Sequence, residues 1–222
     1  MSQAILESVE RCTGSPVSGS VIWLHGLGAD GHDFEPLVPL LTPPGIALRY
    51  VFPHAPVRPV TINNGMTMPA WFDVIGLDRQ SRQDETGIRK ADQQVHELVR
   101  RENERGIPTE SIVLAGFSQG GALALHTALR FPERLAGVIG LSCFLPLAWT
   151  IDAELAETSR ETPIFLAHGA QDPLVPPVMG SETRDFLQAR GFTVEWKSYP
   201  MAHEVCPEEI THIRDYLRGR LA

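Results

Sequence analysis

The sequence predicts an α/β fold with a mostly parallel central sheet and helices on both of its faces. Apolar, strand-like runs alternate with helical patterns along the chain. These runs are continuously apolar, which is typical of strands covered on both faces. The chain has 222 residues, of which 43% are hydrophobic and 21% charged, enough for one large domain. We therefore expect a single domain over residues 1–222, without internal repeats or linkers.

Each expected element follows from its local pattern. The expected strands are Ser20–Leu24, Ile46–Phe52, Ser111–Ala115, Leu135–Leu141, Pro163–Ala167 and Thr193–Tyr199. The expected helices are Asp84–Arg105, Gln119–Phe131, Pro177–Arg190 and Pro207–Arg220. The first helix has an N-cap candidate in Asp84, a stop at 106–108, and an apolar stripe at helical spacing formed by Ile88, Ala91, Val95, Leu98 and Val99.

The segment Pro53–Asp73 is expected to be a long irregular loop. It is rich in Pro, Asn, Gly and Met, and Trp71 and Phe72 stand near its end. A loop of this length in a compact domain is usually functional or disordered. Its apolar and aromatic content favours a packed loop near a functional site, and the alternative is a surface excursion with its own small cluster.

Composition and charge exclude several classes of function. The net charge of −8 and the absence of a basic cluster argue against nucleic-acid and membrane-surface binding. No apolar run approaches the ~20 residues that span a bilayer, so no integral membrane association is expected. Residues 1–10 lack the pattern of a signal peptide. The three cysteines suit neither a disulfide framework nor a zinc site, and a reducing cytoplasm is the expected location.

Residues 112–121, Ile-Val-Leu-Ala-Gly-Phe-Ser-Gln-Gly-Gly, carry the clearest chemical signal. A strand, a G-x-S-x-G turn with Ser118 at its apex, and a helix together predict a nucleophile elbow. Gly116 and Gly120 flank the serine where strand and helix nearly touch and leave no room for a Cβ. The alternative is a Gly-rich turn with a solvated serine.

A serine nucleophile needs a general base, and His203 is the best of the eight histidines. It follows the strand ending at Tyr199 and precedes the last helix, in a loop at the carboxyl end of the sheet. The orienting acid should lie between Ser118 and His203 in the chain. Asp172 lies in the loop after the strand ending at Ala167 and fits this place, with a helix N-cap as its alternative role.

The loop Gly26–Gly31 formally contains G-x-G-x-x-G after a strand, which raises the alternative of an NAD(P)-binding protein. The acid that such a site needs about 20 residues later is missing, because residues 49–52 stand there. We instead expect the backbone N–H groups of Leu27 and Gln119 to form an oxyanion hole. His25 is interpreted as a residue that braces this loop.

Taken together, the sequence resembles the carboxylesterase and acyl-protein thioesterase family of α/β-hydrolases, also called phospholipase/carboxylesterases. The resemblance rests on His25–Gly28, on Gly116–Gly121, on Leu141-Ser142 with Leu145-Pro146, on His168-Gly169 with Asp172, on His203, and on two further segments, Phe52–Pro56 and Met68–Asp73. It spans nearly the whole chain. Asn64 departs from the pattern, where a second glycine is expected, and this puts the conformation of that loop in question.

The resemblance implies a serine hydrolase of short-to-medium acyl esters or thioesters that needs no cofactor and no metal. Acyl-protein thioesterase and lysophospholipase activities stand as alternatives, as does a non-catalytic binding module with the same fold. Some members of the family dimerise near the active site, so a homodimer is an oligomeric state that the resemblance allows.

Apolar residues on loops beside the expected site are candidates for the acyl pocket. These candidates are Trp71, Leu77, Phe144, Leu145 and Val175, and ordinary core packing is their alternative role. The segment between Leu141 and Pro163 is too short to hold a large lid domain. We therefore expect an open cleft with modest selectivity for acyl-chain length.

Overall fold

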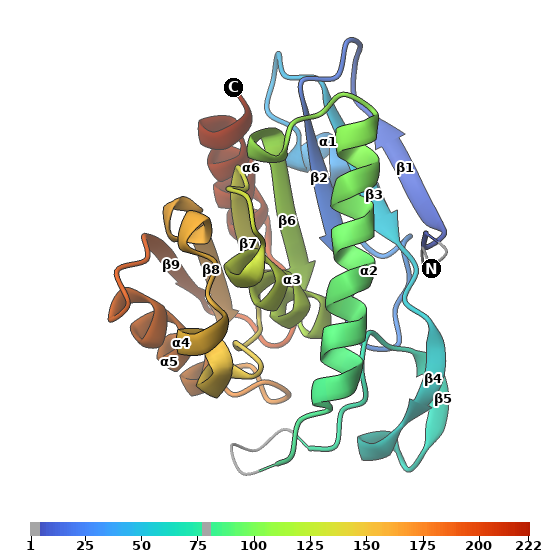
Figure 1. The fold of residues 1–222 in the computed structure, drawn as a ribbon, viewed down its shortest axis with the longest axis vertical. Coiled ribbons are helices and arrows are strands. Elements are labelled where there is room, and N and C mark those ends of the chain that lie inside the picture. The colour runs from blue at the N-terminus through green and yellow to red at the C-terminus, as the bar shows by residue number, and fades with distance from the viewer. Residues whose placement is uncertain (1–4, 77–80) are drawn as a thin grey trace.

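The computed structural model describes residues 5–76 and 81–222 and contains a seven-stranded sheet in the order β1-β3-β2-β6-β7-β8-β9 (Figure 1). Strand β1 pairs antiparallel with β3, and the other neighbouring pairs are parallel. The bounds are β1 Ser8–Cys12, β2 Gly19–Leu24, β3 Leu48–Pro53, β6 Ile112–Phe117, β7 Gly137–Leu141, β8 Ile164–Gly169 and β9 Val194–Tyr199. The six expected strands are present, with ends shifted by a few residues.

Helices cover both faces of this sheet, as expected. One apolar cluster packs α2 (Glu85–Glu104), α3 (Gln119–Arg130) and α5 (Pro177–Gln188) against the face that Figure 1 shows. A second cluster packs α1 (Val38–Leu41) and α6 (Pro207–Leu221) against the opposite face. The short helix α4 spans Ile151–Glu154, and brief 3-10 helices span Glu35–Leu37, Thr61–Asn63, Thr109–Ser111, Ala148–Thr150 and Glu157–Glu161.

Helix α2 has the N-cap, the apolar face and the C-terminal glycine that were predicted from its sequence. The Asp84 carboxylate accepts a hydrogen bond from the Gly87 N–H at 2.9 Å, which caps the first turn. Gly106 follows the helix at φ +87°, a left-handed conformation that glycine adopts without strain. The five residues of the predicted stripe are all buried against the sheet or α3: Ile88, Ala91, Val95, Leu98 and Val99.

The strand β1 was not expected from the sequence. Its residues are polar or half-exposed, and its pairing with β3 leaves it at the edge of the sheet. An edge strand needs little apolar surface, because its side chains face solvent on one face and at the open edge. The hydrophobic pattern therefore gives no signal for it.

The segment Pro53–Asp73 is more regular than expected. It contains a small antiparallel hairpin of β4 (Val57–Val60) and β5 (Met66–Pro69). Asn64 turns the chain with φ 55° and ψ 34°, a left-handed conformation that asparagine tolerates better than most residues. The loop therefore closes without the expected second glycine. The Asp73 carboxylate holds the hairpin by accepting from the Thr61 N–H at 2.7 Å and the Thr61 hydroxyl at 2.6 Å.

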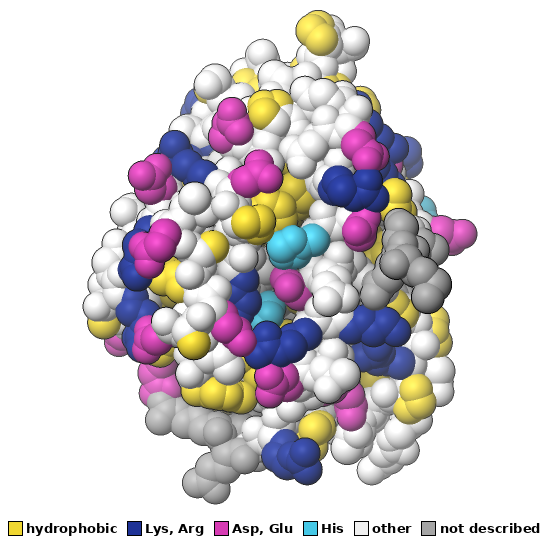
Figure 2. Space-filling view, in the orientation of Figure 1, with side chains coloured by type: hydrophobic (Ala, Val, Ile, Leu, Met, Phe, Trp, Pro, Cys, Tyr) yellow, Lys and Arg dark blue, Asp and Glu magenta, His cyan; other side chains and the backbone are white. Residues whose placement is uncertain are grey.

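The surface carries mixed charge. Figure 2 shows acidic and basic side chains interspersed over the face that contains α2, with apolar side chains in small groups between them. None of the helices in residues 5–76 and 81–222 is long and apolar enough to cross a membrane.

Candidate active site

Ser118 stands at a sharp turn between β6, which ends at Phe117, and α3, which begins at Gln119. Its backbone has φ 54° and ψ −119°, a conformation that non-glycine residues rarely adopt. The two flanking glycines allow this turn. A Cβ on Gly116 would collide with the backbone of Gly120, and one on Gly120 would collide with the backbone of Leu24. This is the geometry of a nucleophile elbow.

Asp172 and His203 are brought together from the loops after β8 and β9. The Asp172 carboxylate is buried and lies 2.7 Å from His203 Nδ1. Its other oxygen accepts hydrogen bonds from the N–H groups of Leu174 and Val175, each at 2.9 Å. The His203 ring also packs on Phe117, with ring centroids 4.7 Å apart. With Nδ1 directed at the carboxylate, Nε2 is the nitrogen that can accept a proton.

Ser118 and His203 line one cavity of about 460 Å³, together with Leu27 and Gln119. Gln119 is the first residue of α3, and the first N–H groups of a helix have no partner within it. The loop that carries Leu27 faces the elbow, since a Cβ on Gly26 would lie 3.6 Å from Ser118 Cβ. This arrangement supports the expected oxyanion hole.

His25 holds the loop opposite the elbow in place. Its Nε2 accepts from the Ala55 N–H at 3.0 Å, so Nδ1 carries the proton and donates to the Gly26 carbonyl at 2.8 Å. Burial lowers the pKa of the ring, which favours this neutral form. The His25 carbonyl in turn accepts from Trp71 Nε1 at 2.9 Å. These contacts agree with the interpretation of His25 as a bracing residue.

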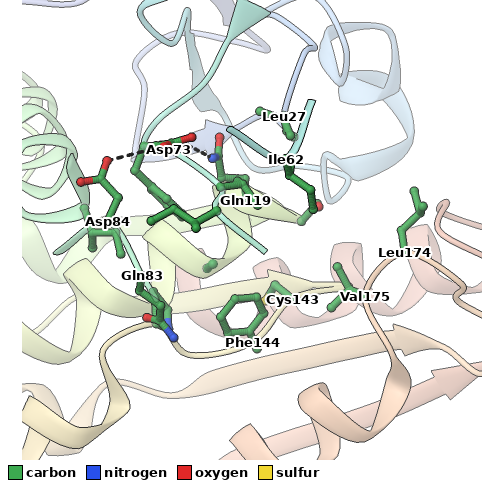
Figure 3. A pocket seen from close by; sticks show the side chains of 18 of the residues that line it. Leu27, Ile62, Asp73, Gln83, Asp84, Gln119, Cys143, Phe144, Leu174 and Val175 are labelled. Atoms are coloured by element: carbon green, nitrogen blue, oxygen red, sulfur yellow. Dashed lines mark hydrogen bonds between the residues drawn. The ribbon is translucent and has the colours of Figure 1, made fainter. Parts of the chain in front are cut away.

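The Gln119 side chain has a role that the sequence did not indicate. Its Oε1 accepts from the Trp71 N–H at 2.9 Å and its Nε2 donates to the Phe72 carbonyl at 2.8 Å. These two buried bonds tie the elbow to the chain that leaves β5. Figure 3 shows this side chain beside Asp73, whose N–H donates to the Asp84 carboxylate at 3.0 Å.

The candidate acyl-pocket residues fall into three groups. Phe144 and Val175 line the cavity (Figure 3). Trp71 and Leu145 are buried outside its lining, and Trp71 instead joins the bracing contacts of His25 and Gln119. Leu77 lies outside the residues that the structure describes.

Much of the cavity wall comes from residues that were not among the acyl-pocket candidates named from the sequence. These are mainly apolar side chains from the hairpin, from the chain before α2, and from the loops after β7 and β8: Ile62, Phe72, Val74, Ile75, Cys143 and Leu174. Burial raises the pKa of the Cys143 thiol, which keeps it protonated. The expectation that Pro53–Asp73 approaches the site identifies part of this wall.

The glycine loop does not have the form of a dinucleotide site. It packs against the elbow, and the next helical segment is a 3-10 helix at Glu35–Leu37 that leads into α1, which is four residues long. A pyrophosphate site needs a longer helix whose N-terminus opens directly from the loop. Within residues 5–76 and 81–222, no group of three or more His, Cys, Asp or Glu side chains could hold a metal ion.

Comparison with known proteins agrees with this geometry. The family described as Phospholipase/Carboxylesterase matches residues 7–220. The chain is 40% identical over 215 residues to acyl-protein thioesterase 1 of Neurospora crassa, covering 92% of this chain and 87% of that protein. The crystal structure of SOBER1 of Arabidopsis thaliana superimposes with a TM-score of 0.88 at 34% identity, covering 92% and 99% of the two chains. That of maize acyl-protein thioesterase 2 gives 0.85 at 28% identity, covering 97% and 100%. The chain therefore belongs to the phospholipase/carboxylesterase family of α/β-hydrolases, which are hydrolases of ester bonds.

Proposed function

We propose that this protein is a carboxylesterase that cleaves short-to-medium acyl esters through an acyl-enzyme on Ser118. The observation that carries the proposal is the hydrogen bond between the buried Asp172 carboxylate and His203, whose ring lines the same cavity as Ser118. A serine on a strained turn, a histidine with one free nitrogen and a buried carboxylate form the constellation of a serine hydrolase.

In the acylation step, Ser118 Oγ attacks the acyl carbonyl and His203 Nε2 takes the hydroxyl proton. Asp172 fixes the ring orientation and stabilises the imidazolium that forms. The N–H groups of Leu27 and Gln119 hold the oxyanion of the tetrahedral intermediate. His203 then gives its proton to the leaving alcohol or thiol as the bond to that group breaks.

In the deacylation step, water attacks the acyl-Ser118 carbonyl and His203 accepts a proton from it. Collapse of the second tetrahedral intermediate releases the carboxylic acid and returns the proton to Ser118 Oγ.

The apolar lining of the cavity favours binding of the acyl chain of the substrate there. Ile62, Phe72, Phe144 and Val175 present hydrocarbon near Ser118, and burial of acyl methylenes against them favours binding. The thiol of a thioester would leave by the same route as an alcohol. Thioesterase activity is therefore the second candidate, favoured by the relatives named acyl-protein thioesterase.

Substitution of the nucleophile tests the proposal. We expect Ser118→Ala to fold and to hydrolyse p-nitrophenyl butyrate several orders of magnitude more slowly than wild type, with a remainder from the oxyanion hole and binding. Ser181→Ala is the control and should match wild type. It removes a hydroxyl on α5 whose exposed hydrogen bond goes to the Val178 carbonyl of the same helix. Near wild-type turnover by Ser118→Ala would reject the proposal.

A substrate panel tests the finer assignment. Matched oxygen esters, thioesters and lysophospholipids of equal acyl length should be compared by kcat/KM. We expect turnover of oxygen esters and thioesters of four to eight carbons. Activity confined to lysophospholipids would replace the carboxylesterase assignment with a lysophospholipase.

A further inference from the structure

A second cavity of about 270 Å³ lies next to the first. Of the residues that the structure describes, three border both cavities: Gly76, Gln83 and Phe144. The two spaces therefore share a wall. Neither the expected catalytic residues nor the oxyanion loop lines the second cavity, so the proposed reaction does not use it.

The second cavity has apolar side chains over much of its wall, and the polar side chains of Ser81, Gln83, Glu182 and Thr183 also border it. Leu145, Ala148, Trp149, Met179 and Phe186 supply most of its apolar lining. The polar group of Thr183 is already engaged, because its hydroxyl donates to the Met179 carbonyl at 2.9 Å and accepts from the Leu145 N–H at 3.0 Å. Leu145, expected from the sequence to contact the acyl group, lies on this second cavity.

In the part of the chain that the structure describes, the shared wall contains one anchored polar side chain and one aromatic ring. Gln83 is anchored, since its Oε1 accepts from the Leu147 N–H at 2.8 Å. Phe144 is partly buried and contributes to the lining of both cavities. In Figure 3 Gln83 and Phe144 lie on the same side of the first cavity. Among the described residues that border both cavities, Gly76 has no side chain, and Phe144 contributes an apolar ring that a substitution can remove.

We propose that Phe144 determines acyl-chain length by closing the first cavity off from the second. In the wild-type protein the ring ends the space available to the acyl chain. With the ring removed, the two cavities join and the second receives the distal methylenes of a longer chain. This inference rests on the proposed function, because it assigns the acyl group to the first cavity.

The test compares wild type, Phe144→Leu and Phe144→Ala on p-nitrophenyl esters of four to sixteen carbons. The quantity measured is the ratio of kcat/KM for the twelve-carbon ester to that for the four-carbon ester. Each methylene newly removed from water is worth about fourfold in this ratio. We expect the ratio to rise at least about tenfold in Phe144→Ala, and less in Phe144→Leu, which keeps part of the bulk.

A double variant separates the second cavity from simple enlargement of the first. Ala148 borders only the second cavity, so Phe144→Ala with Ala148→Trp refills that space while the first cavity stays enlarged. We expect the double variant to return the ratio to near its wild-type value. An unchanged ratio in a folded Phe144→Ala or Phe144→Leu, or a gain that persists in the double variant, would overturn the inference.

The outcomes also separate this inference from the proposed function. Loss of all ester hydrolysis in wild type, or hydrolysis that does not depend on Ser118, would reject the function itself. Hydrolysis that depends on Ser118, with the same chain-length ratio in wild type and the Phe144 variants, would reject only the role of Phe144.

Discussion

At the scale of single residues, Asp172 uses both carboxylate oxygens. One oxygen accepts two backbone N–H groups of its own turn, and the other faces His203 Nδ1. His168 adds to this turn, because its buried Nε2 lies 2.9 Å from the Val175 carbonyl and 3.5 Å from the Asp172 carboxylate. Burial lowers the pKa of His168, so the neutral ring donates there. The turn thus fixes the carboxylate before substrate binds.

The first prediction at this scale concerns Asp172→Asn. An amide keeps the shape of the turn but can donate to His203 Nδ1 and so favour the wrong tautomer of the ring. We expect kcat for p-nitrophenyl butyrate to fall about 10⁴-fold with the circular dichroism spectrum unchanged. Asp185→Asn, an exposed change on α5, should match wild type. A loss below tenfold in Asp172→Asn would contradict the role assigned to Asp172.

The second prediction concerns the Gln119 side chain. Gln119→Ala leaves the buried Trp71 N–H and Phe72 carbonyl without these partners while the Gln119 backbone N–H is retained. We expect the free energy of unfolding in urea to fall by about 2–4 kcal/mol. Gln188→Ala removes an exposed amide at the end of α5 and should change it by less than about 0.5 kcal/mol. Equal stability of the two variants would show that the bonds of Gln119 contribute nothing.

At the scale of elements, the long helices and six strands of the sheet, including the edge strand β9, were predictable, and β1 and the β4–β5 hairpin were not. The stripe from Ile88 to Val99 locates α2, and continuous apolar runs locate β2 and β6 to β8. Strand β1 and the β4–β5 hairpin lack that signal, because Ser8, Glu10, Arg58 and Thr67 pair through backbone groups at exposed edges. Their pairing depends on distant partners that a local pattern does not contain.

Helix α6 gives a prediction about stability and pH. The Glu209 carboxyl is fully buried, and burial raises its pKa from 4.5 to about 8. At a pH between these two pKa values, the Glu209 carboxyl is deprotonated in the unfolded chain and protonated in the folded protein. The contribution of Glu209 to stability therefore declines as pH rises from about 4.5 to about 8.

The Glu209→Gln side chain is neutral at every pH, so the variant does not lose stability through this position as pH rises. We expect the variant to gain stability over wild type as pH rises, by roughly 2–4 kcal/mol more at pH 8 than at pH 4 in urea unfolding. Glu208→Gln alters an exposed neighbour in the same turn and is the matched control. A difference between Glu209→Gln and wild type that does not change with pH would contradict the assignment.

At the scale of the whole molecule, chain order and sheet topology together explain why the site was largely predictable. Ser118, Asp172 and His203 each follow a strand, and β6, β8 and β9 run parallel, so their loops meet at one edge. The cavity wall was harder to predict, because Ile62, Val74 and Leu174 come from separate segments that meet only in the fold. Trp71 was expected in the acyl pocket because it is aromatic and near the site. It instead braces the site through hydrogen bonds and does not line the cavity.

The short connection between β7 and β8 predicts simple saturation kinetics. The segment between β7 and β8 holds only α4 and two 3-10 helices, so it adds no lid domain over the cavity. We expect the rate on p-nitrophenyl esters to rise hyperbolically with concentration and without a jump where the substrate begins to aggregate. Rates followed from well below to above that concentration check this, and a sharp increase at the onset of aggregation would contradict an open cleft.

The central claim is that Ser118 is the nucleophile and that Asp172 and His203 activate it. The most direct measurement is the intact mass and peptide map of wild type, Ser118→Ala and His203→Ala after brief exposure to a fluorophosphonate. We predict one adduct per wild-type chain, located on Ser118, no adduct in Ser118→Ala, and labelling slowed by at least about 10³-fold in His203→Ala. An adduct on another residue, or equal labelling of wild type and His203→Ala, would contradict the account.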